Sequence, residues 1–127
     1  MDRASKGRVL VVEDDDQVRA FIRTLLGNNG YTVLEARTGL EGLAIAEKEG
    51  SQVDLLLSDM LLPELSGFDL AQRVIERNPG IKVLFMTGYV EGDIVQRCIS
   101  ELGASFLDKP FQPTALLARV ENAITSP

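Results

Sequence analysis

The sequence of 127 residues is 45% hydrophobic, and 19 acidic against 13 basic residues give it a formal net charge of −6. This length accommodates a single buried core, so we predict a single domain over residues 1–127 with its core at about 8–125. The acidic excess argues against a nucleic-acid-binding surface, because phosphate contacts need clustered Lys and Arg.

Cysteine, histidine and apolar runs restrict the class of protein further. The single cysteine, Cys98, cannot form an intrachain disulfide, and we expect it in the core. The sequence has no run of 18 apolar residues and no apolar segment typical of a signal peptide, so we expect a cytoplasmic chain that does not enter a membrane. It also contains no histidine, which excludes phosphorylation on His, His-based catalysis and His metal ligands in this chain.

Short apolar runs alternate with helical patterns along the chain. The runs predict five buried strands, at residues 8–12, 32–36, 53–58, 82–86 and 105–107. Each is followed by a segment in which apolar residues recur at the spacing of one helix face. Thr38 and Glu41 have the spacing of a capping box at the start of the second helix, and Pro113 suits the first turn of the last one.

Strands that alternate with helices predict a parallel sheet covered by helices on both faces, because parallel strands need crossovers and these are right-handed. We therefore predict an α/β fold, with one doubly wound five-stranded parallel sheet and five helices. In such sheets ligands bind beyond the carboxyl ends of the strands. The residues directly after each strand are thus the first candidates for function.

Polar residues follow four of the predicted strands. Glu13 and Asp14 follow the first, Asp59 the third, Thr87 the fourth and Lys109 the fifth. Carboxylates that lie close together repel one another unless they share a cation or a nearby lysine. Oxygen ligands without His or paired Cys favour Mg²⁺ or Ca²⁺, and few protein ligands favour Mg²⁺, which keeps positions for water or a phosphoryl group.

Such a set of residues suits phosphoryl transfer. Asp59 is the best candidate for the nucleophile, because it stands alone after the most apolar strand, whereas Glu13 and Asp14 sit together as a metal-binding pair would. Thr87 and Lys109 can donate hydrogen bonds to the oxygens of the incoming group.

Each of these residues also has an ordinary structural interpretation. Asp14 can cap the first helix, as we expect Asp15 and Asp16 to do, and a lone Asp after a strand is more often a turn residue than a nucleophile. Thr-Gly and Lys-Pro pairs are common in loops. Only the combination, in this order and at four separate strand ends, points to phosphoryl chemistry.

Four segments carry a family resemblance, VLVVEDD, DLLLSDMLLPELSG, VLFMTGY and FLDKPF. In them the chain resembles the receiver domains of two-component response regulators, from Val9 to about Ile124. The resemblance implies a single receiver domain with a flavodoxin-like fold, strand order 2-1-3-4-5, and a cis peptide bond between Lys109 and Pro110.

The resemblance also implies a role for each site residue. These are Asp59 as phosphoacceptor, Glu13 and Asp14 as the acidic pair around Mg²⁺, Leu61 as a metal ligand through its backbone carbonyl, Thr87 as switch hydroxyl, Lys109 as site lysine and Phe106 as aromatic switch.

What the resemblance implies about function is a signalling switch rather than an enzyme. A histidine kinase or histidine phosphotransfer protein donates a phosphoryl group to Asp59, and the domain catalyses its own phosphorylation and dephosphorylation. The surface of the fourth helix, fifth strand and fifth helix then changes. The resemblance leaves three questions open. It does not identify the output domain or target, it does not decide whether phosphorylation produces a dimer, and the parent protein can be a hybrid sensor kinase or a stand-alone regulator. Ala104 and Ser105 stand where many winged-helix regulators carry an acidic residue for dimer salt bridges, which weakens a DNA-binding assignment.

Three other functions fit the sequence less well. A phosphatase of the haloacid dehalogenase-like kind also has an Asp after a parallel strand, but it needs a second Asp two residues on, where this chain has Leu61. A receiver that only binds other proteins, without phosphorylation, is disfavoured by the complete set of site residues. Nucleotide binding is excluded because both glycine-rich phosphate-binding motifs are missing from the sequence.

Overall fold

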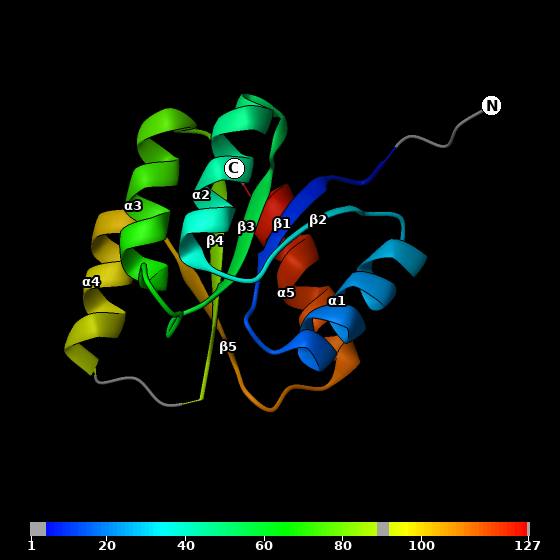
Figure 1. Ribbon diagram of the computed structural model, residues 1–127. Coiled ribbons are helices and arrows are strands. Elements are labelled where there is room, and N and C mark those ends of the chain that lie inside the picture. Colours follow the sequence, from blue (N-terminus) through cyan, green and yellow to red (C-terminus); the bar gives the residue numbers. More distant parts are fainter. Residues whose placement is uncertain (1–4, 89–91, 127) are drawn as a thin grey trace.

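The computed structural model describes residues 5–88 and 92–126, which form a parallel sheet with helices on both faces (Figure 1). The strands are β1 (Arg8–Val12), β2 (Thr32–Ala36), β3 (Leu55–Asp59), β4 (Lys82–Thr87) and β5 (Ser105–Asp108). The helices are α1 (Asp16–Asn28), α2 (Gly39–Glu49), α3 (Gly67–Arg77), α4 (Gly92–Leu102) and α5 (Pro113–Thr125), with a 3₁₀ turn at Gly50–Gln52. Within this described part, the five strands lie in the order β2-β1-β3-β4-β5, which confirms the predicted fold class.

Strand boundaries differ from the prediction at the site and at the start of β3. The prediction of a strand from Val53 was wrong by two residues, because Asp54 instead accepts a hydrogen bond from the Arg8 backbone N–H at 2.8 Å. At their carboxyl ends β3, β4 and β5 each extend one residue further than predicted. Asp59 and Thr87 are therefore the last residues of strands, where the sheet holds the backbone, rather than loop residues.

Alternation along the strands divides the core into two layers. In β1, Val9 and Val11 pack with the residues of α1 and α5, whereas Leu10 and Val12 pack with those of α2, α3 and α4. Figure 1 shows the two groups of helices on opposite sides of the sheet. Cys98 of α4 is fully buried in the second layer, as expected from the sequence.

Side-chain caps fix where the helices begin. Asp15 accepts hydrogen bonds from the backbone N–H groups of Gln17 and Val18, so it is the N-cap of α1 as predicted. Thr38 caps α2 by accepting from Glu41 N–H, but the Glu41 carboxylate accepts from Arg37 N–H instead of the N-cap's own N–H. The predicted capping box is thus displaced by one residue on its return side.

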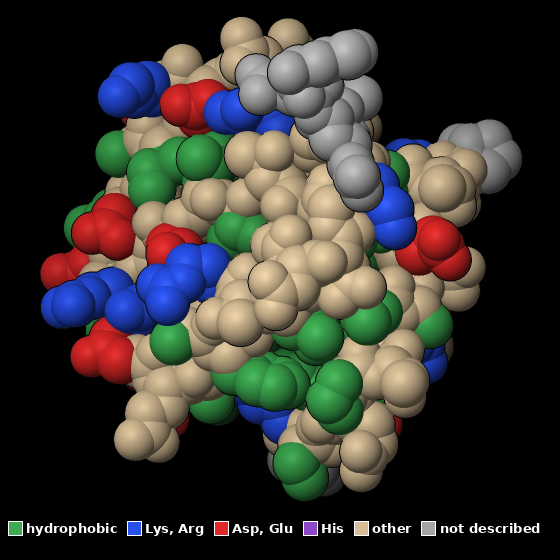
Figure 2. All heavy atoms as spheres, turned by 90° about the vertical axis from the view of Figure 1, so that its right-hand side faces the viewer, with side chains coloured by type: hydrophobic (Ala, Val, Ile, Leu, Met, Phe, Trp, Pro, Cys, Tyr) green, Lys and Arg blue, Asp and Glu red, His purple; other side chains and the backbone are tan. Residues whose placement is uncertain are grey.

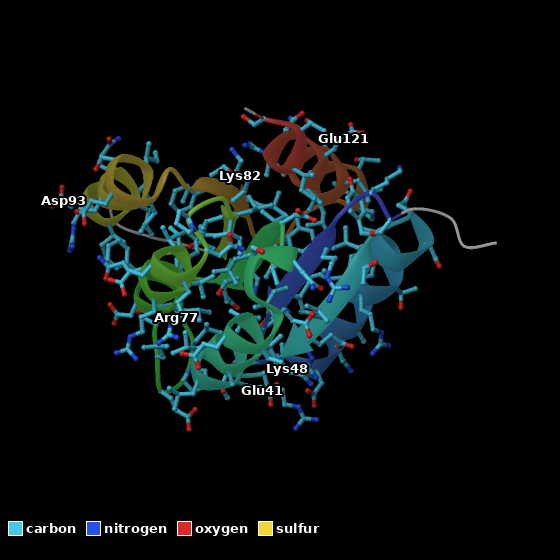
Figure 3. All side chains as sticks on the ribbon, turned by 90° about the horizontal axis from the view of Figure 1, so that it is seen from above. Glu41, Lys48, Arg77, Lys82, Asp93 and Glu121 are labelled. Atoms are coloured by element: carbon cyan, nitrogen blue, oxygen red, sulfur yellow. The ribbon has the colours of Figure 1, made fainter. Side chains whose placement is uncertain are left out.

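Charged side chains cover the outside of the helices. Figure 2 shows Lys and Arg interspersed with Asp and Glu on one face of the molecule. Figure 3 shows Glu41, Lys48 and Arg77 at the periphery, and all three are exposed. The helices therefore turn apolar faces to the sheet and polar faces to water. None of the helices in the described ranges is both long and apolar enough to span a bilayer.

A close approach of α3 to β3 supports the end of the strand that carries Asp59. Gly67, the first residue of α3, donates its N–H to the Met60 carbonyl at 3.0 Å. A Cβ at Gly67 would run into the carbonyl oxygen of Asp59 and would lie 3.0 Å from the Met60 Cα. Because these are backbone atoms, they cannot move aside without moving the strand end.

We expect Gly67→Ala to lower the free energy of unfolding by about 1–3 kcal/mol, the usual cost of overpacking a tight site. Gly27→Ala in the last turn of α1 is the matched control, since its Cβ would meet nothing within 4 Å. That control should raise stability by roughly 0.5–1 kcal/mol, because Ala favours helix over Gly. Urea unfolding of both variants measures the difference, and equal stability of the two would contradict the close approach.

Candidate functional site

Three carboxylates meet at the carboxyl edge of the sheet. Glu13 directly follows β1, Asp14 is next to it, and Asp59 ends β3, which pairs with β1. One carboxylate oxygen from each lies within 4.8 Å of the others. Glu13 is buried, Asp59 is half-buried and Asp14 is exposed. Adjacent parallel strands thus bring together the acidic residues that the sequence singled out.

Lys109 reaches into this cluster from the end of β5. Its ammonium donates hydrogen bonds to Glu13 Oε1 at 2.6 Å and to Asp59 Oδ2 at 2.8 Å. Its backbone N–H donates to the Thr87 carbonyl at 2.8 Å, and its peptide bond to Pro110 is cis, as the resemblance implied. Burial lowers the pKa of Lys109, but the hydrogen bonds to Asp59 and Glu13 outweigh burial, so the pKa is raised overall.

The charges of the cluster do not balance. Glu13, Asp14 and Asp59 carry three negative charges when ionised, and Lys109 supplies one positive charge. A divalent cation would neutralise the remaining two charges, and carboxylate oxygens are the ligands that Mg²⁺ prefers. The three carboxylates therefore fit Mg²⁺ as the divalent ion.

The other predicted site residues lie on β4, on β5 and in the loop after β3. Thr87 ends β4 next to the strand of Asp59 and is only 8% exposed. Phe106 lies in β5 opposite Phe85, with ring centroids 5.8 Å apart, and is half-buried. Leu61 has a 78% exposed side chain, and the role of its carbonyl stays a prediction. Tyr89, the last residue of the motif VLFMTGY, is outside the described residues.

Sequence reasoning missed an apolar pocket beside Lys109. It has a volume of about 480 Å³ and is lined by Gln17, Val18 and Phe21 of α1 together with Lys109, Pro110 and Phe111. Figure 2 shows hydrophobic side chains gathered in the lower half of this face, toward the end of the molecule where the strands finish. Phe21 belongs to the apolar stripe of α1, yet it is 45% exposed. The sequence pattern alone could not separate it from the buried Ile22.

A second feature that the sequence did not indicate is the support of Glu13. The Arg19 side chain donates to the Glu13 backbone carbonyl at 2.8 Å, and the Asp15 N–H donates to Glu13 Oε2 at 3.1 Å. Arg19 is itself buried and pairs with Asp16 at 2.6 Å. Arg19 and the Asp15 N–H therefore restrain the acidic turn in addition to Lys109.

A carboxylate cluster with a lysine, at this edge of a doubly wound sheet, has ligands and charge that suit a divalent cation. Comparison with known proteins agrees with this class. The profile of the response regulator receiver domain matches residues 9–121. The chain therefore belongs to the response regulator receiver domain family, the receivers of two-component signalling.

Relatives include both large and small proteins. The chain is 36% identical over 123 residues to the sensor kinase CckA of Brucella abortus, which covers 97% of this chain but only 13% of the kinase. It is 31% identical to the response regulator receiver protein CpdR of the same species, over 92% of this chain and 96% of that protein.

Solved structures give the same fold. The receiver domain of the hybrid histidine kinase CckA superposes with a TM-score of 0.81 at 36% identity, covering 94% of this chain and 100% of that one. A CheY-like receiver domain protein from Methanospirillum hungatei gives a TM-score of 0.87 at 30% identity and covers 94% of each chain. The match thus spans nearly the full length of these two receiver structures.

We expect Lys109→Met to lower the free energy of unfolding in EDTA by roughly 1–3 kcal/mol at pH 7, because Glu13 and Asp59 lose their shared cation. The folded-state pKa of Lys109 lies above its ordinary value of 10.5. Its stabilisation is therefore complete below 10.5 and is lost as the pH rises through the folded-state pKa. Urea unfolding from pH 7 to about 11 checks this, and a gap between wild type and variant that narrows already near neutral pH would contradict it.

Proposed function

We propose that this receiver takes up a phosphoryl group on Asp59 from a histidine of a partner protein, in a reaction that depends on Mg²⁺. The observation that carries the proposal is the Lys109 ammonium bonded to both Asp59 and Glu13, with Asp14 in the same cluster. Glu13, Asp14 and Asp59 would hold the Mg²⁺, together with the Leu61 carbonyl. The ion would supply positive charge to the phosphoryl oxygens.

The residues of the chain divide the chemistry among them. An Asp59 oxygen attacks the phosphorus, an O–P bond forms, and the N–P bond to the donor imidazole breaks with its electron pair leaving on nitrogen. Lys109 stays protonated and holds a phosphoryl oxygen, and the Thr87 hydroxyl holds another. Attack of water on phosphorus later releases phosphate and restores the Asp59 carboxylate, so the domain catalyses both directions of its own switch.

The donor histidine has to lie outside this sequence, because the sequence contains no histidine. A histidine kinase or histidine phosphotransfer protein therefore supplies the group. We place its docking helix on the apolar pocket of Val18, Phe21 and Phe111, because Lys109, which bonds to Asp59, also lines this pocket. We therefore also propose that the chain works in the cytoplasm.

The output follows from Thr87 and Phe106. Thr87 moves toward the phosphoryl oxygens and frees space near β5, and Phe106 turns inward to fill it. Phe106 already packs at the edge of the α2, α3 and α4 layer, next to Phe85. A shift in population between two arrangements of α4, β5 and α5 then changes the surface that a target or a second copy binds.

The two alternatives fit the site less well. A phosphatase of the haloacid dehalogenase-like kind needs a second carboxylate two residues after the nucleophile, and Leu61 occupies that position with an exposed apolar side chain. An interaction module without phosphorylation would not need a buried Glu13 and a lysine held between carboxylates. One relative is a large sensor kinase and another is a small receiver protein. Both a hybrid sensor kinase and a stand-alone regulator are therefore proposals for the parent protein.

We expect intact mass after incubation with Mg²⁺ and acetyl phosphate to rise by one phosphoryl group in the wild type. Asp59→Asn should show no gain, since the amide cannot act as the nucleophile, and EDTA should abolish the gain in the wild type. Asp54→Asn is the matched control at the other end of β3, where the carboxylate accepts from Arg8 N–H, and it should be labelled normally. Labelling of Asp59→Asn at the wild-type level would sink the assignment.

Docking can be separated from chemistry with Phe21. With a phosphorylated histidine phosphotransfer protein chosen because it labels the wild type, Phe21→Ser should slow transfer about tenfold, the loss of a modest interface anchor. Labelling by acetyl phosphate, which needs no docking surface, should be unchanged. Leu40→Ser is the control, because Leu40 is similarly exposed but lies on α2. Equal slowing with both donors would argue against the pocket as a docking site.

A further inference from the structure

We infer that Arg19 is a positioning residue for the metal-binding turn, which sets the affinity for Mg²⁺ through the backbone of Glu13. The inference rests on the proposed function of the site. Within the described residues, Arg19 makes no hydrogen bond to the Asp59 carboxylate or to Lys109. It contacts the backbone and side chains that surround the site instead.

The contacts of Arg19 join three segments. One nitrogen of its guanidinium donates to the Glu13 carbonyl at 2.8 Å in a fully buried bond. Another pairs with Asp16 in the first turn of α1 at 2.6 Å, and Nε lies 3.4 Å from Glu35 of β2. Two carboxylates therefore hold the guanidinium in place while it donates a hydrogen bond to the turn that follows β1.

The bond to Glu13 also helps to place the backbone of Asp14. The peptide bond between these residues is planar, so holding the Glu13 carbonyl also fixes the orientation of the Asp14 N–H and the position of its Cα. Glu13 has further restraints, since its N–H donates to the Ala36 carbonyl and its carboxylate accepts from Lys109. The exposed Asp14 carboxylate has no hydrogen bond in the described part of the chain, so no partner side chain orients it and its place in the cluster depends on the backbone of the turn and on its own rotamer.

Only a guanidinium can make this set of contacts. Its planar fork offers donors in three directions, whereas a lysine ammonium is a single point that cannot reach Glu13, Asp16 and Glu35 together. Outer residues that orient metal ligands commonly change metal affinity by about 10–100-fold when removed.

The surroundings of Arg19 should allow its removal without unfolding. Asp16 keeps a second partner in Arg37 at 3.6 Å, and Glu35 keeps Arg23 at 3.3 Å. Both carboxylates are partly exposed, so neither is left buried without a cation. Arg19→Met retains the apolar stem and removes only the guanidinium, which makes it a specific test.

The experiment titrates Mg²⁺ into metal-free protein by calorimetry, with thermal unfolding in EDTA as a separate readout. Arg19→Met should raise the Mg²⁺ dissociation constant about tenfold, and Arg19→Lys should recover part of that loss. At saturating Mg²⁺, Arg19→Met should still be labelled by acetyl phosphate on Asp59. Arg23→Met is the matched control one turn along α1, since Arg23 shares Glu35 but does not contact Glu13, and its dissociation constant should match the wild type.

Two results would overturn the inference. A lower unfolding temperature of Arg19→Met with an unchanged Mg²⁺ dissociation constant would make Arg19 a structural residue only. An equal loss of affinity in Arg23→Met would assign the effect to general charge around Glu35. Should Arg19→Met fail to fold, Arg19→Lys decides, because an unchanged dissociation constant there contradicts the need for a guanidinium. A wild type that binds Mg²⁺ but is not labelled refutes the proposed function alone, since the titration of the variants still stands.

Discussion

The ammonium of Lys109, held between Glu13 and Asp59, is the interaction on which the arrangement of the site depends. It requires β1 and β3 to be neighbours, so that their last residues meet, and it requires β5 to be close enough for a long side chain to pass the end of β4. The strand order supplies both conditions. A strand order in which β1 and β3 were not neighbours would separate these carboxylates.

The same cluster carries unbalanced charge at a partly buried site, which lowers stability locally, and the rest of the fold compensates for this. Three carboxylates around one ammonium leave an excess of negative charge, and the buried Glu13 would be costly without its partners. The surrounding strands are almost entirely apolar and pack on helices from both sides, so the stability of the domain comes from elsewhere. Sites that violate the ordinary rules of burial in this way are where function is expected, because the unbalanced charge is what binds a cation.

Much of the fold and the site could be predicted from local patterns. Apolar runs located all the strands, and the polar residues after them identified Glu13, Asp59 and Lys109, because strand ends in a parallel sheet share one edge. The start of β3 was misplaced because Val53 continues the apolar run, and only the pairing of Asp54 with Arg8 shows where the strand begins. The contacts of Arg19 depend on Glu35 lying opposite Val11, a register between strands that spacing along the chain does not reveal.

In the proposed switch, the input pocket and α4 lie in different layers, although α5 shares the layer of α1. The apolar pocket beside Lys109 belongs to the layer of α1, whereas α4 packs through Cys98 in the opposite layer. Figure 3 shows α4, with Asp93, on the other side of the molecule from α1. A donor seated at the pocket would therefore leave α4 accessible, and the proposed phosphoryl group on Asp59 would lie at the edge between the two layers. This geometry suits a domain that is a small part of a sensor kinase in one relative and nearly the whole protein in another, because neither surface needs a second domain to be complete.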